Sequence, residues 1–100
     1  MIRGTTPTYT LTMPLDTSLV KTARVIFSQR DTTKVIKTDG QITMEGSELK
    51  MKLTQEETLA FHCDAPVDIQ LRVLTNDGAA LASGIYKDYV EPCLDNEVME

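Results

Sequence analysis

Apolar and polar residues alternate along most of the chain, with the period of two that is typical of β-strands half buried against a core. The clearest run has Val67, Ile69, Leu71 and Val73 separated by polar residues. Similar alternation covers residues 8–13, 21–29 and 49–53, where Ala23, Val25 and Phe27 share one face of the second run. These patterns predict four strands, and the strand over 67–73 is expected to be central.

Turn-forming residues separate the predicted strands. Turns are expected at residues 29–32, Asp39-Gly40, Glu45-Gly46-Ser47 and Asn76-Asp77-Gly78. Since residues 34–37 directly precede Asp39-Gly40, they are expected to form one arm of a hairpin, with residues 41–44 following the turn.

The rest of the chain adds one strand and one helical turn. A last strand is expected over residues 80–90, where Gly84 indicates a bulge or a close backbone approach. Thr54 and Glu57 have the spacing of a capping box, which predicts one short helical turn near residues 54–59. Six to seven short strands in 100 residues predict an all-β, antiparallel sandwich or small barrel of residues 8–91.

Composition and charge narrow the functions that this domain can have. With 41% hydrophobic and 25% charged residues, the chain is expected to fold as one small domain. Ten basic and fifteen acidic residues give a net charge of −5, a poor match for nucleic acid. Four lysines, at positions 34, 37, 50 and 52, form a basic stripe only if their strands are neighbours, and they lack the interleaved aromatics of a single-strand binder. The usual use of such lysines is to prevent edge-to-edge aggregation.

Charge is distributed unevenly between the two halves. Residues 1–55 carry eight basic and five acidic groups, or +3, whereas residues 56–100 carry two basic and ten acidic groups, or −8. Copies could pair head to tail through these opposite charges, or folding could interleave the two halves.

Candidate catalytic chemistry is sparse. His62 and Cys63 are adjacent, so on an extended chain they point to opposite faces and do not activate a thiolate. Cys63 and Cys93 are expected to be reduced, because residues 1–7 are not followed by the apolar run of a secretory signal. Glu56-Glu57 is best explained as a solvated first helical turn. We expect no catalytic, metal or cofactor site, no small-molecule substrate and no membrane span.

Three segments are candidates for binding a partner. Residues 1–7 are expected to form an extended N-terminal arm, and residues 92–100 an acidic C-terminal tail. The candidate residues are Ile2, Arg3, Thr5, Thr6 and Pro7 in the arm and Leu94, Val98 and Met99 in the tail. The alternatives are a frayed terminus and a disordered tail. Ile85, Tyr86 and Tyr89 are expected to serve either in an interface patch or in the core.

Four stretches of the chain carry a resemblance to known proteins. They are Met1-Ile2-Arg3-Gly4-Thr5-Thr6-Pro7-Thr8, Lys52-Leu53-Thr54-Gln55-Glu56-Glu57-Thr58-Leu59, Ile69-Gln70-Leu71-Arg72-Val73-Leu74-Thr75 and Cys93-Leu94-Asp95-Asn96-Glu97-Val98. Together they resemble a family of short proteins encoded by phages and prophages of gut Firmicutes. More loosely, Ala23 to Val90 is similar to the immunoglobulin-like N-terminal domain of phage baseplate upper proteins. This resemblance implies an immunoglobulin-like β-sandwich.

The resemblance also implies a non-enzymatic structural or accessory protein of a virion, baseplate or head. Its partners would be copies of itself and other phage structural proteins, in the virion or in the host cytoplasm during assembly. Because these 100 residues do not include the long C-terminal extension of a full baseplate protein, a receptor-binding or fibre-holding role is not expected. One alternative is a soluble binding module that inhibits a host protein through its acidic half. A small thiol or metal enzyme would need His62, Cys63 and Cys93 to converge.

Overall fold

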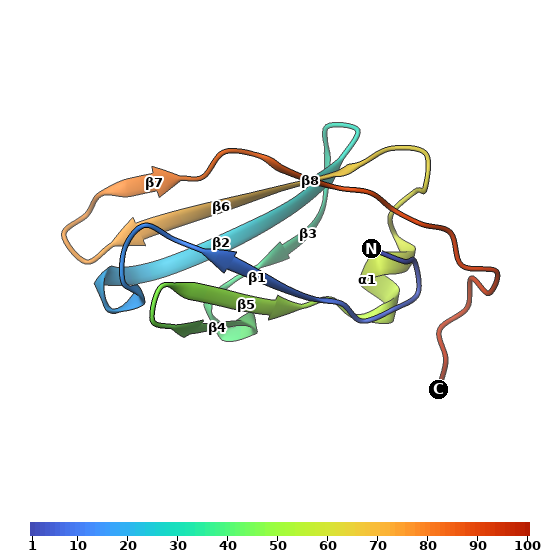
Figure 1. Ribbon diagram of the computed structural model, residues 1–100, viewed down its shortest axis with the longest axis horizontal. Helices are drawn as coiled ribbons and strands as arrows, with labels where there is room; N and C mark the ends of the chain where they lie inside the picture. Colours follow the sequence, from blue (N-terminus) through green and yellow to red (C-terminus); the bar gives the residue numbers. More distant parts are fainter.

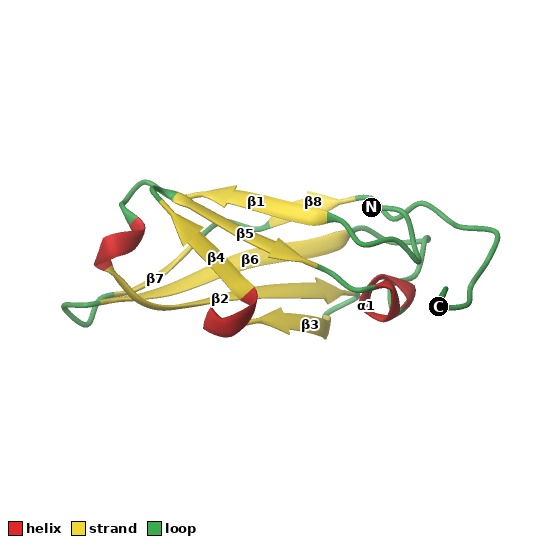
Figure 2. Ribbon diagram, turned by 90° about the horizontal axis from the view of Figure 1, so that it is seen from below, coloured by secondary structure: helices red, strands yellow, loops and turns green.

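Two antiparallel β-sheets pack face to face in the computed structural model, which describes residues 1–100 (Figures 1 and 2). The strands are β1 (Thr8–Thr12), β2 (Val20–Gln29), β3 (Thr32–Lys37), β4 (Ile42–Glu45), β5 (Glu48–Lys52), β6 (Val67–Thr75), β7 (Ala80–Ala82) and β8 (Tyr86–Asp88). One α-helix, α1 (Gln55–Leu59), and two 3₁₀ turns, η1 (Thr17–Leu19) and η2 (Asp39–Gln41), complete the chain. The predicted all-β sandwich is therefore confirmed.

Strand β6 lies at the centre of the larger sheet, as its regular alternation predicts. The order is β3-β2-β6-β7, and β8 pairs with β6 beyond β7 on the same side. The smaller sheet has the order β1-β5-β4. Alternate residues of β2, β5 and β6 face the space between the sheets and are buried there. The fifteen buried apolar residues of the core are Met13, Ala23, Val25, Phe27, Val35, Ile42, Leu49, Met51, Leu53, Phe61, Val67, Ile69, Leu71, Val73 and Val90.

The turn between β2 and β3 is a two-residue hairpin, as predicted for residues 29–32. Gln29 pairs with Thr32, and the two residues between them, Arg30 and Asp31, have positive φ angles of 54° and 62°. Positive φ at both central positions is typical of the type I′ turn, which matches the twist of the flanking strands.

The hairpin predicted at Asp39-Gly40 is wrong. Strands β3 and β4 belong to different sheets, and η2 carries the chain from one sheet to the other. The Asp39 carboxylate accepts hydrogen bonds from the Thr22 hydroxyl at 2.7 Å and the Ala23 backbone N–H at 2.8 Å. These bonds attach the crossover to β2, so the Asp-Gly pair connects the two sheets.

The chain forms eight strands because the last predicted strand, residues 80–90, is split into β7 and β8. Arg72 pairs with Ala82 and Ile69 with Tyr86, so two residues of β6 lie opposite three residues, 83–85. The extra residue is the bulge expected near Gly84. A Cβ added at Gly84 would meet no atom within 4 Å, which excludes the close approach. Ser83 continues the pairing, since its Oγ accepts from the Leu71 N–H at 3.0 Å.

One inward-facing position of β2 carries a polar side chain. Gln29 is fully buried, two residues after Phe27. Its Nε2 donates to the carbonyls of His62 and Ala65, both at 2.6 Å, and its Oε1 accepts from the His62 N–H at 2.7 Å. The side chain therefore holds the loop between α1 and β6 with all its bonds satisfied.

Candidate interaction surface

The two sheets leave an open seam on one side of the sandwich. We define the seam as the cleft between residues 12–15, which end β1 and follow it, and strands β7 and β8. Leu81 and Tyr86 lie opposite Val73 and Ile69, so they belong to the inner face of the larger sheet. They are nevertheless 45% and 49% exposed, because no strand of the smaller sheet covers them. A mainly apolar cavity of about 340 Å³ occupies the seam.

Further apolar side chains continue from the seam along the chain. Ile85 is 60% exposed and Tyr89 is 79% exposed. The core alternative for Ile85, Tyr86 and Tyr89 is therefore wrong: the bulge and the short edge strands leave all three in contact with solvent. Several exposed large apolar residues beside an open sheet edge are typical of a region that binds another chain.

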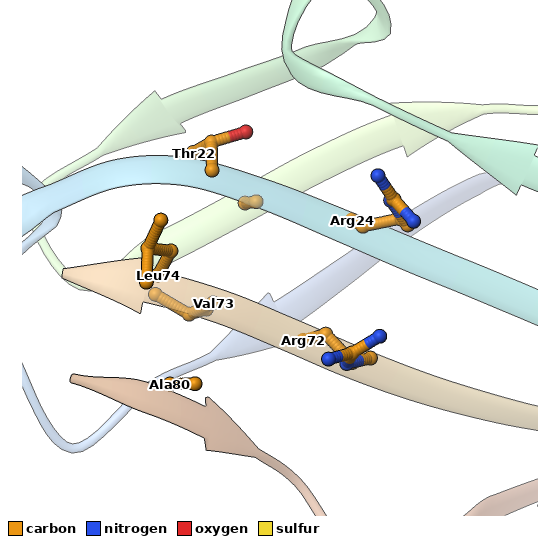
Figure 3. A pocket seen from close by; sticks show the side chains of 7 residues that line it. Thr22, Arg24, Arg72, Val73, Leu74 and Ala80 are labelled. Atoms are coloured by element: carbon orange, nitrogen blue, oxygen red, sulfur yellow. The ribbon is translucent and has the colours of Figure 1, made fainter. Parts of the chain in front are cut away.

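A second hollow lies on the outer face of the same sheet, beside β7. Its volume is about 330 Å³, and its lining includes Arg24 of β2, Arg72 of β6 and Ala80 of β7 (Figure 3). Arg24 and Arg72 occupy directly opposite positions in the register of the two strands. Neither guanidinium takes part in a hydrogen bond or an ion pair, so the hollow presents two free cationic groups.

The N-terminal segment does not extend away from the domain as expected. The chain turns at Gly4, where φ is 81°, and Ile2 forms a parallel bridge with Glu91. The Arg3 N–H donates to the Glu91 carbonyl at 3.0 Å, and the Glu91 N–H donates to the Met1 carbonyl at 2.7 Å. These bonds hold the segment against its own chain.

Asp88 joins this segment to the inner face of the sandwich. Its carboxylate accepts from the Met1 amino group, at 3.4 Å, and from the Tyr9 hydroxyl, at 2.5 Å. Partial burial and the neighbouring Asp88 carboxylate raise the pKa of Tyr9 well above its usual value. This contact closes the sandwich at one end and leaves the seam open beyond it.

The arm and the tail meet at α1. Arg3 Nη1 donates to the side-chain oxygen of Asn96 and Nη2 to the Leu59 carbonyl, both at 2.9 Å. The side-chain amide of Gln55 exchanges two hydrogen bonds with the backbone of Met99, at 2.8 and 3.1 Å. Figure 1 shows both termini at this end of the molecule and β7 at the other end. The tail is therefore held at two points.

The candidate partner-binding residues have different exposures at this end. Ile2, Thr5, Thr6, Leu94, Val98 and Met99 are exposed, whereas Arg3 and Pro7 are partly buried. Leu94 is 104% exposed, so its side chain contacts nothing in its own chain. The structure brings Arg3 and Met99 to α1 and leaves Leu94 free.

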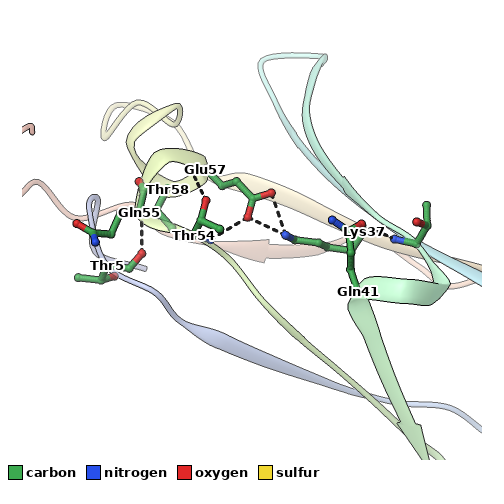
Figure 4. A network of polar contacts seen from close by, with 8 residues as sticks. Thr5, Lys37, Gln41, Thr54, Gln55, Glu57 and Thr58 are labelled. Carbon is green, nitrogen blue, oxygen red and sulfur yellow. Dashed lines mark hydrogen bonds and ion pairs between the residues drawn. The ribbon is translucent and has the colours of Figure 1, made fainter. Parts of the chain in front are cut away.

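The capping box that the sequence predicts at α1 is confirmed, and it also binds a lysine. The Glu57 N–H donates to Thr54 Oγ1 at 3.1 Å, and the Thr54 N–H donates to Glu57 Oε1 at 2.8 Å. Lys37 Nζ reaches both carboxylate oxygens of Glu57, at 2.7 and 2.9 Å (Figure 4). Partial burial opposes ionisation of Glu57, but the bonds from Lys37 and Thr54 hold its pKa below the usual value.

The basic stripe is absent from the fold. Lys50 and Lys52 lie on β5 of the smaller sheet, whereas Lys34 and Lys37 lie on β3 of the larger one. Lys37 faces the interior and pairs with Glu57. The stripe requires neighbouring strands, and β3 and β5 are in different sheets.

His62, Cys63 and Cys93 form neither a disulfide nor a metal-binding group. Cys63 is exposed, Cys93 is partly buried and both are free thiols. No group of three or more His, Cys, Asp or Glu side chains is placed to hold a metal ion. The backbone of His62, rather than its ring, makes the bonds to Gln29.

Sequence reasoning missed three residues of these surfaces. Arg24, Arg72 and Leu81 lie in the expected strands, but their juxtaposition depends on strand register and on which strand edge stays uncovered. A single sequence carries no pattern for either property. The sequence could assign each of the three residues to one face of a predicted strand, but it could not show that they lie together.

Three comparisons with known proteins find no similar protein. A scan against protein-family models finds no match, and comparisons with curated proteins and with solved structures find none. None of the helices has the length and apolar character needed to cross a membrane.

Proposed function

We propose that the chain is a non-enzymatic structural or accessory protein of the phage type, which acts by joining copies of itself within a larger assembly. The observation that carries this proposal is the seam, where Leu81 and Tyr86 face inward but remain about half exposed. A single copy has no strand left to cover them. The occupant we assign to the seam is a second copy of this chain.

The unpaired edge strands support this assignment. Strands β7 and β8 form one edge of the larger sheet, and β1 forms the facing edge of the smaller sheet. Edge strands offer free backbone groups for pairing with another chain. Covering the seam would bury apolar surface, which stabilises the contact by about 25 cal/mol for each Å² removed from water.

The ends of the molecule favour a head-to-tail arrangement. The principal extents are 47, 28 and 16 Å, and the seam lies beside β7, away from the two termini at α1 (Figure 1). Joining unlike ends produces a ring when the rotation closes and a filament when it does not. Both outcomes suit a virion, baseplate or head component.

The test is light scattering coupled to size exclusion on the full chain over a wide range of concentration. We expect a discrete oligomer or filament whose population rises with concentration. The double variant Leu81→Ser/Tyr86→Ser should lower the extent of assembly at least about tenfold, the effect of losing about 1.4 kcal/mol of contact free energy. The control is Ile36→Ser on β3, because Ile36 is as exposed as Leu81 at 45% but lies on the opposite edge strand.

Two results would contradict the proposal. Equal assembly of the seam variant and the control would exclude the seam as the contact. A wild-type chain that stays monomeric at every concentration would exclude self-association and favour the alternative, a soluble binding module directed at a host protein.

A further inference from the structure

The opposed arginines Arg24 and Arg72 carry an electrostatic cost within one copy. They face each other across β2 and β6 on the outer surface of the larger sheet. Like charges at directly opposite positions of two strands destabilise a sheet. Natural sequences break such local rules of stability mainly at functional positions. The pair is therefore a candidate functional site.

Neither arginine forms an ion pair within its own chain. Along the ladder, the neighbouring pairs on the same face are Thr22 with Leu74 and Ile26 with Gln70. The next acid along β6, Asp68, is already paired with Lys87 at 2.7 Å. Asp39 is close enough for Arg24 to contribute to lowering its pKa, but its oxygens accept from the Ala23 N–H and the Thr22 hydroxyl.

The hollow between the arginines has room for a ligand and an apolar wall. Its volume of about 330 Å³ lies at the lower end of the range for small-ligand sites. The side chains of Leu74 and Ala80 lie on the same face as the two guanidinium groups and form the apolar part of the hollow. Figure 3 shows Arg24 and Arg72 on the neighbouring strands β2 and β6, with Leu74 near the end of β6 and Ala80 on β7. A ligand that carries carboxylates next to one apolar side chain would match both parts.

The tail of this chain has that composition. Residues 91–100 hold four acids and no base. Within the tail, Leu94 is followed by Asp95 and is fully exposed. Because Arg3 holds Asn96 and Gln55 holds Met99, the tail stays beside α1, away from β7. The tail of one copy is therefore placed to meet the arginines of another copy rather than its own.

We propose that Arg24 and Arg72 form a carboxylate-binding site that receives residues 91–100 of a second copy, which are the acidic tail and the Glu91 that precedes it, with Leu94 on the apolar wall. The recognition is by charge-assisted hydrogen bonds from two planar guanidinium groups, the groups best suited to carboxylates. This inference rests on the proposed self-association and names the contact that determines its direction.

The experiment measures binding of a synthetic peptide of residues 91–100, labelled at its N-terminus, to the full chain by fluorescence anisotropy. The test variant is Arg24→Gln/Arg72→Gln. The matched control is Lys50→Gln/Lys52→Gln, which removes the same charge from two exposed lysines of β5. We expect about tenfold or greater weakening in the arginine variant and less than about threefold in the lysine variant. A peptide with Glu91, Asp95 and Glu97 replaced by their amides should also lose binding.

The outcomes separate this site from the proposed function. The arginine site is overturned if the arginine and lysine variants bind the peptide equally well. It is also overturned if the wild-type chain assembles but does not bind the peptide. Both results leave the proposed self-association intact. A wild-type chain that is monomeric at every concentration overturns both. Tighter binding of a single-stranded oligonucleotide than of the peptide overturns the choice of carboxylate as the ligand. Loss of both peptide binding and assembly in the arginine variant alone supports the site.

Discussion

The ion pair between Lys37 and Glu57 gives the sharpest stability prediction, because its two members differ in burial. The Lys37 side chain is 5% exposed and the Glu57 side chain is 25% exposed. Both hydrogen bonds of the Lys37 ammonium go to the Glu57 carboxylate. Glu57 keeps a second donor, the Thr54 N–H. Loss of the carboxylate should therefore be worse than loss of the lysine.

The magnitude follows from this asymmetry. Removing one partner of a buried pair typically costs about 3–5 kcal/mol. Glu57→Gln retains one amide oxygen for Lys37, so we expect a cost of about 2 kcal/mol, which lowers the Tm of a domain of this size by about 8–16 °C. Lys37→Met leaves a partly exposed, still hydrogen-bonded carboxylate and should cost about 1 kcal/mol or less. Adding Lys37→Met to Glu57→Gln should then restore stability.

The assay is urea unfolding followed by circular dichroism on the four chains of the double-mutant cycle. Glu56→Gln is the control, because Glu56 is exposed in the same helical turn and should change stability by less than about 0.5 kcal/mol. Equal stability of Glu57→Gln and Glu56→Gln would refute the reasoning. So would a double variant less stable than Glu57→Gln alone.

The same pair predicts the direction of a pH effect. The pKa of Glu57 is lower in the folded chain than in the unfolded chain. Its stabilisation is therefore complete above the unfolded value of about 4.3 and is lost as pH falls through the lower folded value. In the Glu57→Gln variant, the free energy of unfolding should lack this part of its decrease at acid pH.

Three further predictions test particular contacts. Gln29→Leu should cost about 3 kcal/mol in urea unfolding, because it leaves the His62 N–H and the His62 and Ala65 carbonyls without partners; a cost below about 1 kcal/mol would show that the loop finds other bonds. Gly46→Ala should lower the free energy of unfolding by about 1 kcal/mol, because φ is 59° at this position. Gly40→Ala in η2 is the control and should have no measurable effect. Equal Tm values for the two variants would contradict the turn geometry. Arg3→Ala should increase the fast backbone motion of residues 95–98 in ¹⁵N relaxation, since it removes the bond to Asn96, and unchanged relaxation would mean that Arg3 does not hold the tail.

Much of the fold could be predicted from local sequence patterns. The alternation of Val67, Ile69, Leu71 and Val73 correctly identifies the central strand, and Thr54 with Glu57 correctly identifies the capped helix. These patterns succeed because burial on one face and capping depend on residues close together in the chain. Gly84 also marks the bulge correctly, since it is one of the three residues that lie opposite two residues of β6.

The errors concern relations between distant segments. Asp39-Gly40 has the residues of a hairpin turn, but hydrogen bonds from Thr22 and Ala23 make it a crossover between sheets. The sequence pattern places Lys37 among the exposed lysines, but in the fold Lys37 is buried and pairs with Glu57. The seam and the opposition of Arg24 with Arg72 arise from strand order and register, which no short-range pattern specifies. The candidate surface is therefore less predictable than the strands that build it.

The most direct test of head-to-tail self-association is hydrogen–deuterium exchange on the full chain at low and high concentration. The account predicts that residues 80–88, which border the seam, and residues 91–98 of the tail gain protection together as concentration rises. Strand β3, on the opposite edge of the larger sheet, should not change and serves as an internal reference. Protection that is independent of concentration in both segments, or that rises only in β3, would contradict the account.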